Sequence, residues 1–186
     1  MVEIRWHGRG GQGAKTASNL LALAQMASGL WVQAFPEYGP ERSGAPMVAY
    51  NRADAAPIRR HDSVSHPDLV VVLDRSLWTE VEPLAGLAPG GHVLVNAAQA
   101  PPVPDGMPRR VAAVPGDRLA RESGIRYANV VMVGAALALL GQGSAEALQD
   151  AVGAQFGRRL QGQTLAATIR AAAAGFAWAR EEVAAS

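Results

Sequence analysis

The chain has 186 residues, of which 49% are hydrophobic and only 5% aromatic, so it suits one domain with a sizeable core built mainly from Ala, Val and Leu. Its 17 basic and 16 acidic side chains leave a net charge of +1, so no charge excess favours nucleic acid or an anionic membrane. The chain has no cysteine, which excludes disulfides and iron–sulfur clusters held by Cys thiolates.

The first part of the sequence predicts two strands with a helix between them. A strand over 1–6 is followed by a glycine-rich turn at 8–13 and an Ala/Leu-rich helix over 14–28. Gly29 stands where a left-handed C-terminal cap is often needed, and a second strand is predicted over 30–35. This order is that of a βαβ unit, which implies parallel pairing and a right-handed crossover.

The rest of the chain predicts more strands and then mainly helices. Asn129 and Ser144 are expected to cap two of those helices. Strands are expected over 47–51, 69–73, 92–96 and 110–114, and helices over 76–84, 130–140, 145–154 and 160–183. Together these elements predict one α/β domain over 1–186. It should be Rossmann-like and three-layered, with a mostly parallel sheet, helices on both faces and a helical C-terminal part.

The glycine turn fits the pattern G-x-G-x-x-G and stands between a predicted strand and a predicted helix. Glycines let the backbone approach a ligand closely, and the helix N-terminus offers N–H groups to a phosphate. Lys15, the only lysine of the chain, adds a positive charge there. The candidate binding residues are Gly8, Arg9, Gly10, Gly11, Gln12, Gly13 and Lys15. The alternative is a turn that serves packing alone.

Two familiar nucleotide sites fit this turn poorly. An NAD site needs an acidic residue at the end of the second strand, where this chain has Gln33 and Glu37 around Phe35 and Pro36. The G-x-x-x-x-G-K-[ST] spacing of a phosphate-binding P-loop is absent. No residues show the spacing of a catalytic acid–base pair, and the four histidines show no metal-ligand spacing.

The segment 36–46, PEYGPERSGAP, is predicted to be a loop, because it holds three prolines and two glycines. Glu41 and Arg42 lie inside it. Charged residues in such a braced loop suit a subunit interface or a substrate entrance, and we expect these two to form charge pairs with a partner chain. The alternative is an exposed ion pair that contributes little.

Four segments together resemble the γ subunit of pyruvate and other 2-oxoacid:ferredoxin oxidoreductases. They are IRWHGRGGQGAKTAS (4–18), FPEYGPERSGAPMVAYNRADAAPI (35–58), PDLVVVLDRSL (67–77) and NVVMVGAAL (129–137). They follow the order of that family and cover the chain nearly end to end. One departure is Ser43, where many relatives have a second arginine, so the resemblance does not extend to an anion contact by two arginines there.

The resemblance implies an enzyme that oxidatively decarboxylates a 2-oxoacid, with pyruvate the expected one, to acyl-CoA and carbon dioxide and reduces ferredoxin. Thiamine diphosphate is then held by α and β chains, and iron–sulfur clusters by the β chain or a ferredoxin-like δ chain. The γ chain packs on those chains, binds no cofactor alone and is associated with coenzyme A access at an interface.

We therefore expect a cytoplasmic, non-autonomous subunit, since the residues MVEIRWHG show no signal-peptide core and no apolar run is long enough to span a membrane. Two other interpretations remain open. One is a stand-alone nucleotide-binding oxidoreductase, and the other is an assembly factor with an empty glycine turn.

Overall fold

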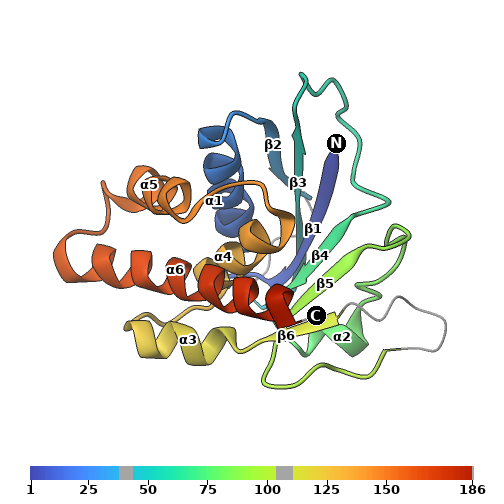
Figure 1. Ribbon diagram of the computed structural model, residues 1–186. Coiled ribbons are helices and arrows are strands. Elements are labelled where there is room, and N and C mark those ends of the chain that lie inside the picture. Colours follow the sequence, from blue (N-terminus) through green and yellow to red (C-terminus); the bar gives the residue numbers. More distant parts are fainter. Residues whose placement is uncertain (38–43, 104–110, 186) are drawn as a thin grey trace.

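A six-stranded sheet runs through the centre of the molecule in the computed structural model, which describes residues 1–37, 44–103 and 111–185 (Figure 1). The strands are β1 (Val2–Arg9), β2 (Trp31–Pro36), β3 (Pro46–Asp54), β4 (Leu69–Val72), β5 (His92–Asn96) and β6 (Val111–Val114). Their order is β2-β3-β1-β4-β5-β6. Only β3 runs antiparallel to its neighbours, so the predicted mostly parallel sheet is confirmed.

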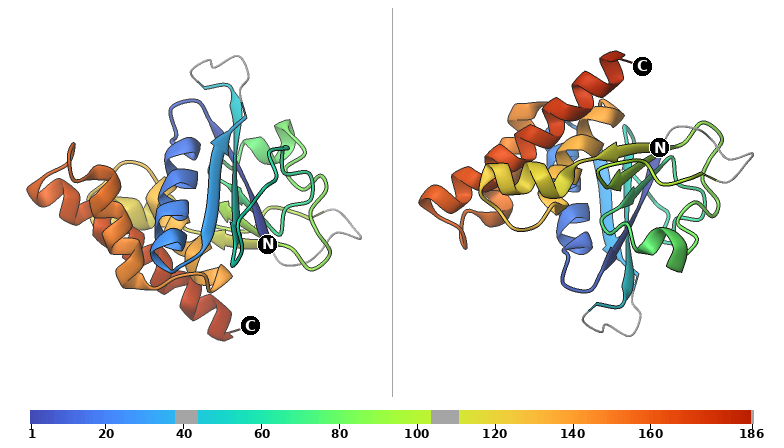
Figure 2. Two further views of the ribbon diagram at one scale, coloured as in Figure 1. Left: turned by 90° about the horizontal axis from the view of Figure 1, so that it is seen from above. Right: turned by 90° about the horizontal axis from the view of Figure 1, so that it is seen from below.

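The helices are shared unequally between the two faces of the sheet (Figure 2). They are α1 (Ala14–Ala27), α2 (Leu77–Glu80), α3 (Gly116–Ser123), α4 (Asn129–Leu140), α5 (Ala145–Phe156) and α6 (Gly162–Ala185). The five longer helices gather on one face, whereas the short α2 and irregular segments cover the other. The predicted three layers and helical C-terminal part are confirmed, but one outer layer is thin.

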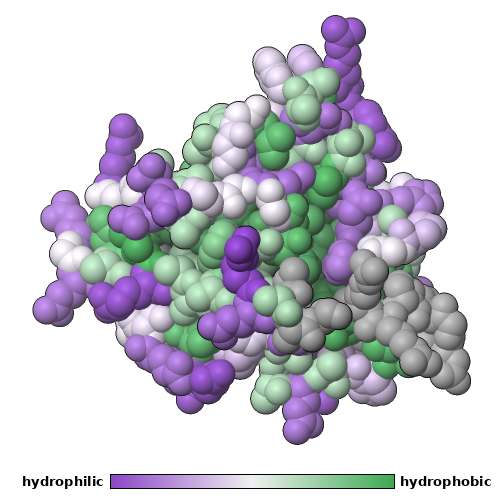
Figure 3. All heavy atoms as spheres, in the orientation of Figure 1, coloured by the Kyte–Doolittle hydropathy of each residue, from purple (hydrophilic) through white to green (hydrophobic). Residues whose placement is uncertain are grey.

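Two hydrophobic clusters fill the space on either side of the sheet. Leu69 and Val71 of β4 face α1 and α4, while Val70 and Val72 face α2. Because side chains alternate along a strand, β4 is apolar throughout, which explains the continuous apolar run seen in the sequence. In Figure 3 hydrophobic residues gather in the middle of the face seen in Figure 1, with hydrophilic residues around them.

Helices α4 and α6 approach each other at two glycines. A Cβ added to Gly134 would lie 2.0 Å from the carbonyl oxygen of Ala172, and one added to Gly175 would lie 1.9 Å from that of Val131. No real Cβ could occupy either place. The close crossing therefore depends on glycine at both positions and buries the apolar α4 under α6 (Figure 1).

The predicted pairing of the first two strands is wrong. β2 does run in the direction of β1, but β3 lies between them and pairs antiparallel with both. The α1 crossover leaves the space of one strand between β1 and β2, and β3 occupies that space. β3 also extends β1 beyond the predicted end at residue 6, since Gly8 pairs with Met47 and Arg9 with Pro46. Gly8 and Arg9 therefore belong to a strand and not to the turn.

Two of the three predicted helix caps are confirmed. Gly29 has a φ of 85° and its N–H donates to the carbonyl oxygen of Met26 at 3.0 Å, and Ser144 Oγ accepts from the N–H of Ala147 at 3.2 Å. Asn129 is not a cap, because it is the first residue of α4 and its Nδ2 donates to the carbonyl oxygen of Gly13 at 3.4 Å. Helix α3 was not predicted separately.

Candidate functional site

The candidate site lies at the carboxyl ends of β1 and β4. After β1 the chain passes through α1 to β2, which lies on one side of β1 in the strand order. It later reaches β4, which lies on the other side of β1. In open α/β sheets, ligands bind where the direction of winding changes in this way. The glycine turn follows β1 and Asp74 follows β4, so the two meet at this point.

Backbone conformation accounts for two of the glycines in the turn. Gly11 has a φ of 94° and Gly13 one of 81°, both in the region that side chains disfavour. A Cβ on Gly13 would also lie 2.6 Å from Nδ2 of Asn129, whereas one on Gly11 would meet nothing within 4 Å. Gly13 is therefore required by conformation and by packing, and Gly11 by conformation alone.

The backbone of the turn is partly used within the protein. The N–H of Gly10 donates to the carbonyl oxygen of Ala45 at 2.9 Å, and the N–H of Gly44 donates to that of Gly10 at 3.1 Å. The N–H of Gln12 donates to the carbonyl oxygen of Arg9 at 2.9 Å. An anion would therefore meet the N–H groups at the first turn of α1, which have no partner inside the helix.

Arg9 is held by carboxylates instead of being open to a ligand. Its side chain pairs with Glu80 and with Asp74, where Nε lies 3.3 Å from Oδ2, and it also bonds Ser76. The bond to Glu80 is the main cause that raises the pKa of Arg9. Burial tends to raise the pKa of Asp74, but hydrogen bonds from Ser76 and Gln12 and the charge of Arg9 outweigh it, so that pKa is lowered.

Gln12 joins the turn to β4 through its side chain. Its Oε1 accepts from the N–H of Arg9 at 2.9 Å, and its Nε2 donates to Oδ2 of Asp74 at 2.7 Å. Nothing in the glycine pattern indicated this role. The structure thus brings the predicted residues 8–13 together, but as a braced corner in which Arg9 and Gln12 already have protein partners.

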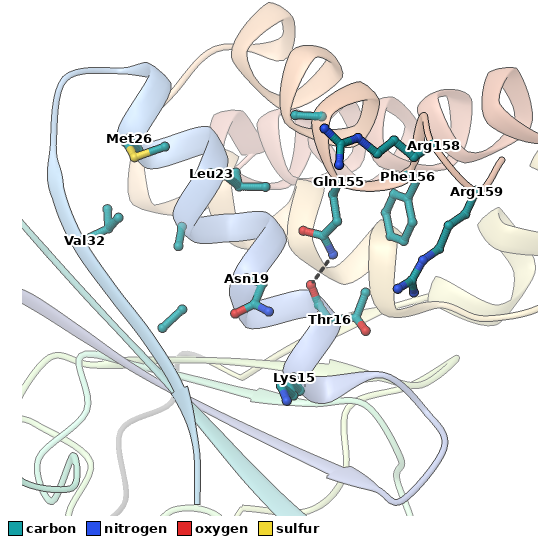
Figure 4. A pocket seen from close by; sticks show the side chains of 13 residues that line it. Lys15, Thr16, Asn19, Leu23, Met26, Val32, Gln155, Phe156, Arg158 and Arg159 are labelled. Carbon is teal, nitrogen blue, oxygen red and sulfur yellow. Dashed lines mark hydrogen bonds between the residues drawn. The ribbon is translucent and has the colours of Figure 1, made fainter. Parts of the chain in front are cut away.

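Lys15 differs from Arg9, since it is exposed and lines a groove of about 840 Å³ between α1, β2 and the end of α5 (Figure 4). Arg158 and Arg159 line the same groove. Nε2 of Gln155 donates to the carbonyl oxygen of Thr16 at 3.0 Å and ties α5 to α1. The sequence shows the arginine pair but gives no sign that these arginines line one groove with Lys15.

Sequence reasoning also missed a polar network on the other face of the sheet. Arg5 Nε donates to Nε2 of His7 at 3.1 Å, and the hydroxyl of Tyr50 donates to the carboxylate of Glu37. Burial, and then the charge of Arg5, lower the pKa of His7 to about 4. Burial, followed by Glu37, raises the pKa of Tyr50 to about 12. Glu37 thus has a structural role as the acceptor of the hydrogen bond from Tyr50.

A second buried arginine lies beside this network. Arg52 is fully buried, and its Nε lies 2.7 Å from Oε1 of Glu3, while its Nη2 lies 3.3 Å from Oδ1 of Asp62. Its guanidinium also lies 5.5 Å from the centre of the Phe35 ring. Glu3, a charged residue within the strand predicted over 1–6, was the signal in the sequence that could have indicated such a pair.

Some of the predictions have no structural test. Glu41 and Arg42 lie outside the described residues, so their proposed interface role stays a prediction. In the part of the chain that the structure describes, no group of three or more His, Asp or Glu side chains is placed to hold a metal ion. Within the same ranges no helix is both long and apolar enough to cross a membrane.

Known proteins resemble the chain over nearly its whole length. The family described as pyruvate ferredoxin/flavodoxin oxidoreductase matches residues 3–178. The pyruvate/ketoisovalerate oxidoreductases common subunit gamma of Thermococcus kodakarensis is 43% identical over 157 residues, which are 82% of this chain and 85% of that one. Pyruvate synthase subunit PorC of Thermotoga maritima is 38% identical over 178 residues, covering 94% and 92%. The crystal structure of pyruvate oxidoreductase subunit PORC from Thermotoga maritima has a TM-score of 0.77 at 34% identity and covers 95% of both chains.

Proposed function

Because this chain belongs to the pyruvate ferredoxin/flavodoxin oxidoreductase family and resembles its γ subunits, we propose that it is the γ subunit of a pyruvate:ferredoxin oxidoreductase. That enzyme would convert pyruvate and coenzyme A to acetyl-CoA and carbon dioxide and pass the electrons to ferredoxin. The observation that carries the proposal is the near-complete match to γ-type chains of similar length.

The chemistry of the described residues supports a subunit that positions others. The chain has no cysteine to hold an iron–sulfur cluster. At the candidate site, Asp74 and Glu80 are paired with Arg9, and the lowered pKa of Asp74 keeps that group ionised near neutral pH. His7 is buried with a pKa of about 4, far from the value that suits proton transfer at pH 7. Thiamine diphosphate and the clusters, held by partner chains, would supply the decarboxylation and the electron transfer.

We propose that this chain contributes to coenzyme A access at the glycine turn. A phosphate of coenzyme A would meet the N–H groups at the first turn of α1 and the charge of Lys15. This set of contacts is smaller than the one predicted from the sequence, which also included Arg9 and Gly10, and two observations support the difference. Lys15 is exposed, whereas Arg9 is paired with two carboxylates. The N–H of Gly10 is bonded to Ala45, so Gly10 shapes the turn instead of meeting the phosphate.

The test is reconstitution from separate chains. The γ chain is produced alone and together with its α and β chains, and with a δ chain where the enzyme has one. Reduction of a viologen dye is then measured with pyruvate and coenzyme A. We expect activity only when γ is present with its partners, and none from γ alone. Robust activity from the isolated chain would overturn the proposal. Saturable binding of NAD(P) in calorimetry would instead favour a stand-alone nucleotide-binding oxidoreductase.

A further inference from the structure

The groove beside Lys15 has an apolar part and a positively charged part. Leu23 and Met26 of α1 and Val32 of β2 form apolar walls, while Lys15 lies at the start of α1 and Arg159 in the turn that follows α5 (Figure 4). Its volume of about 840 Å³ leaves room for several side chains of another molecule. The groove therefore offers an amphipathic surface, with apolar walls on α1 and β2, Lys15 at the first turn of α1, and Arg158 and Arg159 on the side of α5 (Figure 4).

The charge of the groove is one-sided. Lys15, Arg158 and Arg159 all line it and are exposed, and none of its described lining residues is Asp or Glu. The chain as a whole has nearly balanced charge, so this concentration is local. Met26, which lines the groove, is 54% exposed. Exposed apolar side chains beside unpaired cations are typical of a surface that a partner covers.

The backbone of β2 adds a second, independent observation. β2 is the outermost strand of the sheet, and the N–H of Glu37 donates to the carbonyl oxygen of Val48 at 2.9 Å just beyond its end. Hydrogen-bonded pairs alternate along an antiparallel ladder, so the N–H and C=O groups of Val32 and Ala34 point away from β3. These are the β2 residues whose side chains line the groove. An outward backbone edge and the groove thus belong to one surface.

We propose that this surface receives an extended segment of a partner subunit, which adds as a strand to the outer edge of β2. Main-chain hydrogen bonds to Val32 and Ala34 would hold it, as in other cases of strand addition. Alternate side chains of that segment would lie in the groove, apolar ones beside Leu23 and carboxylates beside Arg158 and Arg159, while Lys15 stays available for the phosphate of coenzyme A. The proposal rests on the proposed function, because it takes the chain to work inside a multi-subunit enzyme.

The first test changes only the outward backbone. Ala34→Pro removes an N–H that makes no bond to β3, and edge strands accept proline where the N–H faces outward. We expect this variant to fold with a melting temperature close to that of the wild type and to lose co-purification with the α and β chains. Ala34→Ser keeps the N–H and should assemble normally. Normal assembly of folded Ala34→Pro would overturn the proposal.

Hydrogen exchange keeps the proposal testable where the proline variant fails to fold. In the wild-type complex the amide hydrogens of Val32 and Ala34 should exchange at least about ten-fold more slowly than in the isolated chain, because a paired edge is protected. The amide hydrogens of Gln33 and Phe35, which face β3, are the internal control and should change less. Equal exchange of Val32 and Ala34 in both states would contradict strand addition.

The second test addresses the charge. The double variant Arg158→Glu/Arg159→Glu should weaken assembly by at least about ten-fold, since like charges would then face the partner's carboxylates. Arg180→Glu, an exposed change on α6 outside the groove, should not. If the double variant assembles normally and instead raises KM for coenzyme A, the groove is a small-molecule site and the proposal is wrong. If the wild-type chain does not assemble at all, the proposed function fails and this proposal with it.

Discussion

The N–H of Gly10 donates to the carbonyl oxygen of Ala45 at 2.9 Å and so joins the glycine turn to the start of β3. A phosphate that used this N–H would have to replace a hydrogen bond of about 1 kcal/mol. The turn is therefore held in place by the rest of the protein. Its capacity to bind an anion depends on the N–H groups at the first turn of α1 and on Lys15. The predictions below separate the structural roles of this turn from its proposed contact with coenzyme A.

Gly11→Ala tests the turn against a matched glycine elsewhere. Gly11 and Gly90 have φ values of 94° and 78°, and a Cβ on either meets nothing within 4 Å. Each change to Ala should therefore lower the free energy of unfolding by a similar amount, about 1–2 kcal/mol. If coenzyme A approaches the turn, only Gly11→Ala should raise KM for coenzyme A in the assembled enzyme. Equal KM values for the two variants would leave the turn with a structural role alone.

Lys15→Ala should weaken coenzyme A binding by about ten-fold or more, because a charge-assisted phosphate contact contributes about 1.5–3 kcal/mol. The melting temperature should stay the same or rise slightly, since a cation at a helix N-terminus is unfavourable. KM for pyruvate is the internal control and should hardly move. Lys15→Arg, which keeps the charge, should bind nearly normally. An unchanged KM for coenzyme A in Lys15→Ala would remove Lys15 from the site.

His7 should make the stability of the fold depend on pH. Its pKa is lowered to about 4 from 6.5, first by burial and then by Arg5, so the unfolded chain binds a proton more readily than the folded one. Its contribution is complete above pH 6.5 and is lost as the pH falls toward 4. The free energy of unfolding should fall between pH 6.5 and 5 with a slope of up to about 1.4 kcal/mol per pH unit.

The control for this prediction is His7→Gln, which still offers Arg5 an acceptor but does not titrate. Its urea unfolding free energy should change less between pH 6.5 and 5 than that of the wild type. The carboxylates of the unfolded chain stay ionised over most of this window, so they add little to the slope. Parallel profiles for the two proteins would show that His7 does not titrate as proposed.

The crossing of α4 and α6 should be the most sensitive point of the core. Gly134→Ala or Gly175→Ala would place a Cβ about 2 Å from a backbone oxygen, and such overpacking should cost about 3 kcal/mol or more. Gly153→Ala is the matched control, because Gly153 lies inside α5 with nothing within 4 Å of its added Cβ. That change should stabilise the protein by about 0.5–1 kcal/mol. Similar denaturation midpoints for all three variants would contradict the close crossing.

The sequence predicted the elements well wherever a local pattern decides the structure. The runs that became β4 and β5 are apolar on both faces, and Gly29 and Ser144 are caps whose chemistry is local. It failed where distant segments meet. Nothing in residues 1–35 shows that β3 would lie between β1 and β2, and the role of Asn129 depends on its contact with Gly13.

For the candidate site, too, the sequence predicted the local turn but not the contacts between residues that are distant in the chain. The glycine pattern located the turn, and Gly11 and Gly13 have the positive φ that only glycine adopts easily. The pattern could not show that Arg9 is paired with Asp74 and Glu80, since those residues follow in the chain by more than 60 positions. It also could not show that Arg158 and Arg159 line one groove with Lys15, because that groove requires the packing of α5 on α1.

The parts of the core leave the ribosome in chain order, and the sheet topology decides which of them can pair early. β1, β2 and β3 pair with one another within the first 54 residues, so half of the sheet can form early. Trp6, however, belongs to a cluster that is completed by Met132 and Ala172. At roughly 5–20 residues per second, about 120 further residues take on the order of ten seconds to appear. Until α4 and α6 are made, the part of this apolar face that they cover, beyond the part covered by α1, stays exposed in the nascent chain, and we expect chaperones to bind there.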